Sequence, residues 1–162
     1  MQKNENNLHS IYGGSPISVL SALTRTEFLS IFYLRCFSEN INSKKVLADE
    51  FSYYLGKKRG LKVLSSLDNL YDLLLKKGRK DLILHSISCN YVGVDENSFI
   101  HLISCSICKE KNDALLIATI MTNSHTARSL IKHAQDFAKG ITELLDAYSI
   151  ELDHLNREKK YN

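Results

Sequence analysis

Hydrophobic residues recur at spacings of three and four along most of the chain, and this period places them on one face of an α-helix. The clearest stretch, residues 59–77, is followed by Gly78, a residue type that is common just after a helix end. Another helix is expected to begin at Thr24, where the sequence has the Thr-x-x-Glu spacing of a capping box. Between these two helices, Ser43 is a candidate N-cap for a helix that ends near Gly56.

Two regions depart from this simple pattern. Ser15-Pro16 predicts an earlier helix start, because Pro is favoured at the first helical position. Residues 79–94 lose the helical period and predict a short extended piece or a loop. After them, Asp95 predicts the N-cap of a helix that runs to about Lys109, and a further helix is expected from residue 112 or 113 to residue 121.

The longest pattern lies near the C-terminus, in a helix expected to begin at Ser124 or Thr126. Apolar residues there occupy three positions of each heptad, which describes a helix packed in a bundle. The three rows are Ala127, Ala134, Ile141, Tyr148 and Leu155; Leu130, Phe137 and Leu144; and Ile131, Ala138, Leu145 and Leu152.

The length of this helix leads to two interpretations. Thirty helical residues reach about 45 Å, whereas a compact domain of this size has a radius of gyration near 15 Å. In the first interpretation the helix projects past its own core and forms a homodimer, with Phe137, Ile141, Leu144 and Tyr148 at the interface. In the second, one long helix crosses the whole bundle of a monomer.

These patterns predict an all-α bundle of five to seven helices with a long C-terminal helix. The single Pro and seven Gly of the chain favour long helices over many short strands. Residues 1–14, rich in Asn and Gly, predict a disordered tail, and residues 15–162 predict a single helical domain.

The sequence predicts a cytoplasmic protein that does not associate with a membrane. Residues 1–7 are polar and no apolar signal segment follows them. The longest apolar run, residues 114–121, is far shorter than the roughly 20 residues that a membrane span requires. Without a secretory signal, the four Cys are expected to be reduced thiols or metal ligands.

Five potential zinc ligands lie close together in the sequence, and three of them share a helix face. At about 100° per residue, the three on the expected helix fall within roughly 60° of one another, away from its apolar face. Zinc takes four Cys or His ligands, so residues of the preceding loop could complete the set. The candidate ligands are His85, Cys89, His101, Cys105 and Cys108.

Two other interpretations of the same residues stay open. Buried thiols often serve as small apolar fillers, so Cys105 and Cys108 could simply pack against a loop or helix. A dithiol redox role needs a thiol of low pKa near a helix N-terminus or cations, and Asp95 is ten residues before Cys105. Cys36, in an apolar stretch, is expected in the core.

The stretch from Gly78 to about Leu116 resembles an uncharacterised family of small helical bacterial proteins. The residues that carry the resemblance are Gly78-Arg79, His85 with Cys89 four residues later, and Gly93-Val94-Asp95-Glu96. That family has a second Cys two residues after the first, where this chain has Tyr91. The resemblance covers about a quarter of the chain and implies no established function.

The net charge of +3 is small, but basic residues concentrate between residues 57 and 80. Eight Lys or Arg against Asp68 and Asp72 give this segment a charge of +6. Cations at a helix end also complement its dipole, which is a purely structural role. A nucleic-acid site would use the first group, which consists of Lys57, Lys58, Arg59 and Lys62.

The sequence contains none of the phosphate-binding loops, nucleophile elbows or zinc-protease motifs that are typical of common enzymes. We therefore expect a non-enzymatic regulatory or adaptor protein that acts through helical surfaces as a homodimer. The alternatives are a nucleic-acid-binding regulator and a small structural zinc protein.

Overall fold

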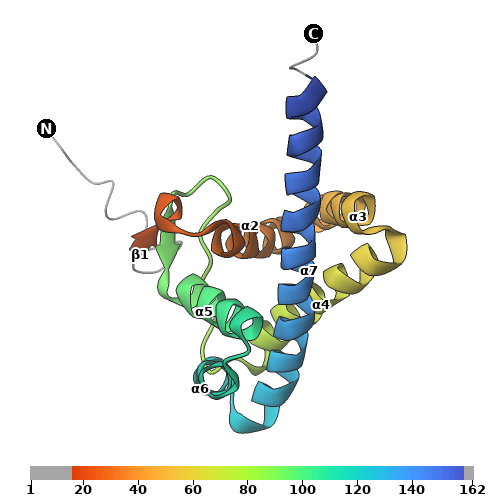
Figure 1. The fold of residues 1–162 in the computed structure, drawn as a ribbon. Helices are drawn as coiled ribbons and strands as arrows, with labels where there is room; N and C mark the ends of the chain where they lie inside the picture. The colour runs from red at the N-terminus through yellow and green to blue at the C-terminus, as the bar shows by residue number, and fades with distance from the viewer. Residues whose placement is uncertain (1–15, 159–162) are drawn as a thin grey trace, which may run out of the picture.

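The protein is an all-α bundle arranged around one long final helix, as the computed structural model in Figure 1 shows. The structure describes residues 16–158, with side chains from 17 to 153, so the predicted disordered tail lies outside the described residues. Six α-helices fall within this part, inside the predicted range of five to seven. They are α2 (Arg25–Glu39), α3 (Ile41–Leu55), α4 (Lys57–Lys77), α5 (Val94–Cys108), α6 (Lys111–Met121) and α7 (Ser124–Glu158).

Helix α7 crosses the whole bundle, so the second of the two interpretations of its length holds for most of the helix. It packs against α2, α3, α4, α5 and α6. Phe137, Ile141 and Leu144, predicted at a dimer interface, are completely buried by the chain's own helices. The upper end of α7 stands clear of the other helices (Figure 1), and Leu152 there is 53% exposed.

Glycines set how closely the helices approach one another. Gly56 joins α3 to α4 with a φ of 78°, a left-handed conformation that glycine adopts without strain. A Cβ atom on Gly60 would lie 2.5 Å from the carbonyl carbon of Phe51, so α3 and α4 meet backbone to backbone at this corner. A Cβ atom on Gly140 would lie 2.5 Å from a methyl carbon of Val63, where α7 crosses α4.

A two-stranded antiparallel sheet corrects one predicted helix start. Strand β1 (Pro16–Val19) pairs with β2 (Tyr91–Gly93), and η1, a 3-10 turn at Leu20–Ala22, leads from β1 toward α2. Ser15-Pro16 therefore does not open a helix. Proline is tolerated at the first residue of a strand, where its missing N–H costs no ladder bond. The extended piece predicted within residues 79–94 is confirmed as β2.

Helix starts were predicted with mixed success. The capping box at Thr24 is confirmed, because the Thr24 and Glu27 side chains each accept a hydrogen bond from the other residue's backbone N–H. Ser43 is not the N-cap of α3. Asn40 takes that place, and its side chain accepts a hydrogen bond from the Ser43 N–H at 2.9 Å. Asp95 lies in the first turn of α5, one residue inside the helix, because the chain is already helical from Val94.

Candidate functional site

Three charged or titratable side chains meet in the centre of the molecule. Arg35 of α2, Glu96 of α5 and His85 of the loop between α4 and β2 are each at most 5% exposed. The guanidinium of Arg35 binds both carboxylate oxygens of Glu96, at 2.7 and 2.9 Å. Glu96 also accepts hydrogen bonds from the backbone N–H groups of His85 and Gly93, and its Oε2 lies 3.0 Å from the His85 Nδ1.

This cluster holds the loop between α4 and β2 in place. The guanidinium also donates to three backbone carbonyls of that loop and of β2, those of Ser86, Cys89 and Tyr91. All five guanidinium N–H groups are thereby used. Burial alone would raise the pKa of Glu96, but hydrogen bonds from Arg35 and from the backbone lower it below its usual range. The cluster is a structural anchor in which the guanidinium N–H groups and both carboxylate oxygens of Glu96 are hydrogen-bonded inside the protein.

The five candidate zinc ligands are not brought together. In residues 17–153 no three His, Cys, Asp or Glu side chains are arranged to hold a metal ion. His85 is fixed beside Glu96 near the start of α5, whereas Cys105 lies nine residues further along that helix, about 14 Å away. Cys89 lies in the same anchored loop, and His101 and Cys108 are exposed on α5.

The packing interpretation holds for Cys105 but not for Cys108, which is exposed, and the prediction that Cys36 lies in the core is confirmed. Cys36 and Cys105 are each 8% exposed and belong to the hydrophobic core. Burial raises the pKa of Cys36 to about 11. Burial and a hydrogen bond with Glu110 also raise the pKa of Cys105, which is opposite to what a reactive dithiol requires.

The predicted basic segment forms the N-terminus of α4 at the corner with α3. Lys57, Lys58 and Lys62 are exposed there. Arg59 instead turns toward α7, where its Nε lies 2.6 Å from the Glu143 carboxylate. The fold thus brings this segment against the middle of α7, a neighbour that the sequence pattern did not identify.

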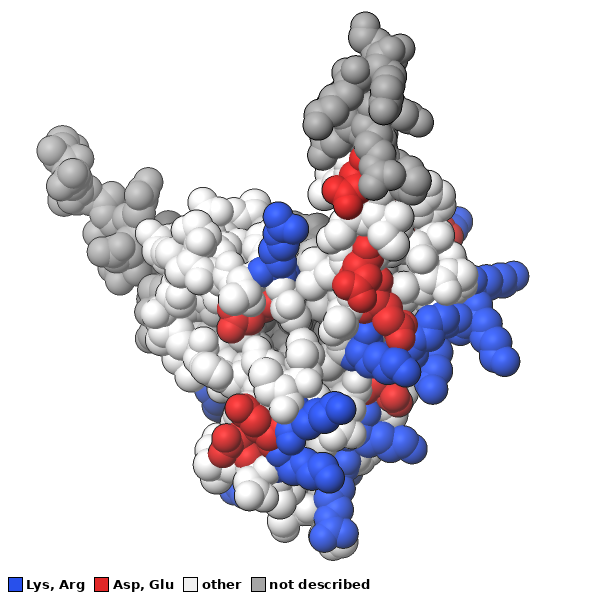
Figure 2. Space-filling view, viewed as in Figure 1, with Lys and Arg blue, Asp and Glu red and all other residues white. Residues whose placement is uncertain are grey.

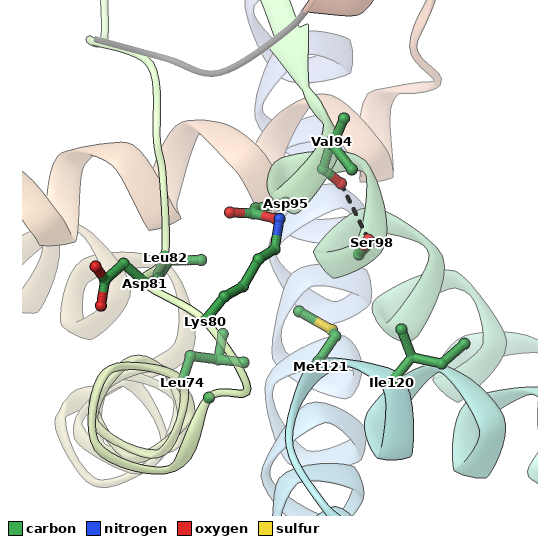
Figure 3. Close-up of a pocket in the computed structure, with 10 residues that line it drawn as sticks. Leu74, Lys80, Asp81, Leu82, Val94, Asp95, Ser98, Ile120 and Met121 are labelled. Carbon is green, nitrogen blue, oxygen red and sulfur yellow. Dashed lines mark hydrogen bonds and ion pairs between the residues drawn. The ribbon is translucent and has the colours of Figure 1, made fainter. Parts of the chain in front are cut away.

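A small pocket lies where the end of α4, the start of α5 and the end of α6 meet (Figure 3). It has a volume of about 230 Å³, and Leu74, Leu82 and Met121 supply apolar walls. Lys80 reaches across it to the Asp95 carboxylate at 2.5 Å, and that carboxylate also accepts the Ile83 N–H. This ion pair holds residues 80–83 against α5, so Lys80 and Asp95 have a structural role in the pocket.

A larger groove runs between the N-terminal part of α2 and the upper half of α7, and is here named the α2–α7 groove. Its volume is about 520 Å³. Most of its walls are apolar, and two of the lining side chains, Phe28 and Leu152, are 39% and 53% exposed. The lining residues are Leu20, Ser21, Leu23, Arg25, Phe28, Leu29, Asn90, Leu145, Tyr148, Ser149 and Leu152.

A hydrogen-bonded network beside this groove fixes α7 against α2 and α3. The hydroxyl groups of Tyr33 and Tyr148 lie 2.6 Å apart, and both donate to the carboxylate of Glu50 at 3.0 and 2.5 Å. Burial is the first cause that raises the pKa of both tyrosines, so they stay protonated. One turn further, the Tyr54 hydroxyl donates to Glu151 at 2.7 Å. The groove therefore has rigid walls.

Sequence patterns could not have found this network, because Tyr33 and Tyr148 are 115 residues apart. Arg35 did carry a signal: it stands among apolar residues from Ile31 to Phe37, which predicts a buried Arg with an acidic partner. Glu96 as that partner was not predictable from spacing.

No membrane-crossing helix is found among the described residues, since none is both long and apolar enough. The chain matches no protein-family model, and comparisons with curated proteins and with solved structures found no similar protein.

Proposed function

We propose that this protein is a non-enzymatic regulatory or adaptor protein that acts through helical surfaces and forms a homodimer through the α2–α7 groove. The observation that carries the proposal is how burial changes along α7 for the apolar heptad residues, which are here named the heptad stripe. Inside the bundle the stripe is covered, and Leu144 is completely buried. From the next residue onward it emerges into the groove, where Leu145 and Tyr148 are half-buried and Leu152 is 53% exposed.

A second copy is the occupant that this geometry favours. Each chain offers both a projecting apolar helix end and, directly beside it, an apolar groove. Two chains related by a two-fold axis can each place the Leu152 region against the other's Phe28 wall, because an isologous interface pairs one patch with itself. Tyr148 keeps its predicted interface position, while the core residues Phe137, Ile141 and Leu144 are replaced by Leu145, Leu152 and Phe28.

Replacing Leu152 by Glu tests the dimer. A charged side chain in the apolar contact should shift the protein to the monomer mass of 18.4 kDa, because burying an unpaired carboxylate is costly. The measurement is light scattering coupled to size exclusion across micromolar concentrations, where the unmodified chain should show twice that mass.

Leu116→Glu is the matched control. Leu116 is 60% exposed, close to the exposure of Leu152, but lies on α6 at the opposite end of α7 (Figure 1). The control variant should remain dimeric. A wild-type chain that is monomeric at the highest concentration, or equal loss of dimer in both variants, would contradict the proposal.

A further inference from the structure

A second groove crosses the middle of α7 and is lined by lysines from both of its sides. Its volume is about 690 Å³. Lys109 and Lys111 come from the turn between α5 and α6, and Lys139 comes from α7. The remaining lining residues are Ser106, Ile107, Gln135, Thr142 and Glu143.

The turn that supplies two of these lysines has an unusual backbone. Lys109 has a φ of 61° and ends α5 in the left-handed conformation, which reverses the chain so that α6 begins two residues later. As a result, Lys109 and Lys111 both line the same groove. Among the described residues, neither lysine forms an ion pair within 4.0 Å.

Glu143 links this groove to the basic corner at the start of α4. One of its oxygens lies 2.6 Å from the Arg59 Nε, and the other lies 4.0 Å from the Lys139 Nζ. Because Arg59 follows directly after Lys57 and Lys58, the cations of α4 and those of the groove lie on either side of the same stretch of α7. The two groups form one basic surface.

The surface is rich in positive charge. It contains seven cations, and Glu143 is the carboxylate that lies among them, 2.6 Å from the Arg59 Nε and 4.0 Å from the Lys139 Nζ. Figure 2 shows Lys and Arg gathered at the α3–α4 corner and along the lower half of α7, whereas acidic side chains follow its upper half. The cations are Lys57, Lys58, Arg59, Lys62, Lys109, Lys111 and Lys139.

We propose that this basic surface binds the phosphodiester backbone of a nucleic acid. The cations are spread over two sides of α7, so a single small anion could contact only some of them, whereas a chain of phosphates can meet them in succession. A lipid bilayer fits less well, because Lys109 and Lys111 line a groove that the flat surface of a membrane does not enter. Contacts of this kind are independent of base sequence.

The test measures how salt weakens binding to a fluorescent random-sequence DNA duplex. Each phosphate that a lysine neutralises contributes about 0.9 to the slope of log affinity against log salt. The triple variant Lys109→Gln, Lys111→Gln, Lys139→Gln should therefore reduce that slope by nearly three. The titrations cover about 50 to 200 mM salt, and circular dichroism confirms that the variant is folded.

A matched triple variant carries the same loss of charge elsewhere. Lys45, Lys76 and Lys77 are exposed but lie outside the basic surface, the last two at the far end of α4. Their replacement by Gln should leave the slope within half a unit of the wild type. Equal slopes in the two triple variants would overturn the proposal.

Two competitors test whether anionic lipid headgroups or free phosphate bind the same basic surface. Vesicles that contain anionic phosphatidylglycerol, and inorganic phosphate at constant ionic strength, are each added to the labelled complex. The duplex should stay bound in both cases. Failure of the wild type to bind the duplex at low salt would overturn the proposal, as would full displacement by either competitor.

Discussion

At the scale of single residues, Arg35 is a buried charge that connects α2 to α5 and to the chain between α4 and α5. A buried guanidinium is costly unless its charge and all its N–H groups are matched. Glu96 matches the charge, and two loop carbonyls and one carbonyl of β2 accept the remaining hydrogen bonds. One side chain thus fixes α2, α5 and the loop that leads into β2.

Replacing Arg35 by Lys should destabilise the protein even though the charge is kept. Lys has three donors on one atom and cannot reproduce the planar, two-pronged contact with Glu96. Several carbonyls and part of the carboxylate would be left buried without partners, at a cost of about 3 kcal/mol. Urea unfolding at neutral pH measures the loss.

The pH dependence of the same variant supplies a second measurement. The pKa of Glu96 is lowered in the folded protein, so its contribution to stability is complete above the unfolded value of about 4.3 and is lost as the pH falls toward the folded value. In Arg35→Lys the Lys side chain is a poorer partner, so the pKa of Glu96 should be lowered less. A smaller part of the unfolding free energy should then depend on pH below about 4.3. An unchanged unfolding free energy and pH profile would show that Lys replaces Arg35 fully.

At the scale of elements, the packing of α4 on α7 depends on the absence of a side chain at Gly140. In a helix interior Ala is usually more stable than Gly by about 1 kcal/mol. Here an added methyl group would lie 2.5 and 2.6 Å from the two methyl carbons of Val63, which is far inside normal contact distance. The steric cost therefore outweighs the gain in helix propensity.

Gly140→Ala should lower the unfolding free energy by about 1–3 kcal/mol, the usual range for overpacking a core. Thermal and urea unfolding of the purified variant measure this change.

Val63→Ala provides the control through a double-mutant cycle. Val63 is completely buried, so its truncation alone should be destabilising by leaving a cavity. Combined with Gly140→Ala, however, the two changes should cost less than their sum, because the new methyl group occupies the space that Val63 gives up. Additive effects would show that α4 and α7 move apart instead of clashing.

At the scale of the whole molecule, α7 has two parts with different surroundings. The apolar face of the part up to Leu144 is covered by the other helices, and the Tyr33–Glu50–Tyr148 network lies where that covering ends. Beyond it, Ile150 and Leu152 are more than half exposed. Stability and self-association should therefore depend on different segments of the same helix.

A chain that ends after Ser149 should keep the fold and lose the dimer. It retains Tyr148 but removes Leu152 and the partly buried hydrogen bond between Tyr54 and Glu151, which contributes about 1.5–3 kcal/mol, less than the roughly 5–15 kcal/mol that stabilises a typical domain. The expected result is a monomer in light scattering, with a circular dichroism spectrum that remains helical. A truncated chain that still dimerises would place the interface elsewhere.

The sequence by itself determined the helices, because amphipathic spacing and local capping depend on residues only a few positions apart. Thr24, Gly56 and Gly78 mark boundaries that the structure keeps, and the single long C-terminal helix was visible in its heptads. At Ser15-Pro16 the local signal for a helix start was wrong, because Pro16 begins a strand that pairs with the distant strand β2.

Only the tertiary structure decided which surfaces are available for binding. Apolar heptad positions continue from Ala127 to Leu152, broken only at Glu151, yet their burial changes along α7 because neighbouring helices cover only the lower part. Likewise, the five His and Cys residues are close in sequence but do not gather into one site among the described residues, whereas Arg59 meets Glu143 across 84 residues. Helix periodicity fixes a side chain's direction on its own helix, while the partner it meets depends on how the helices cross.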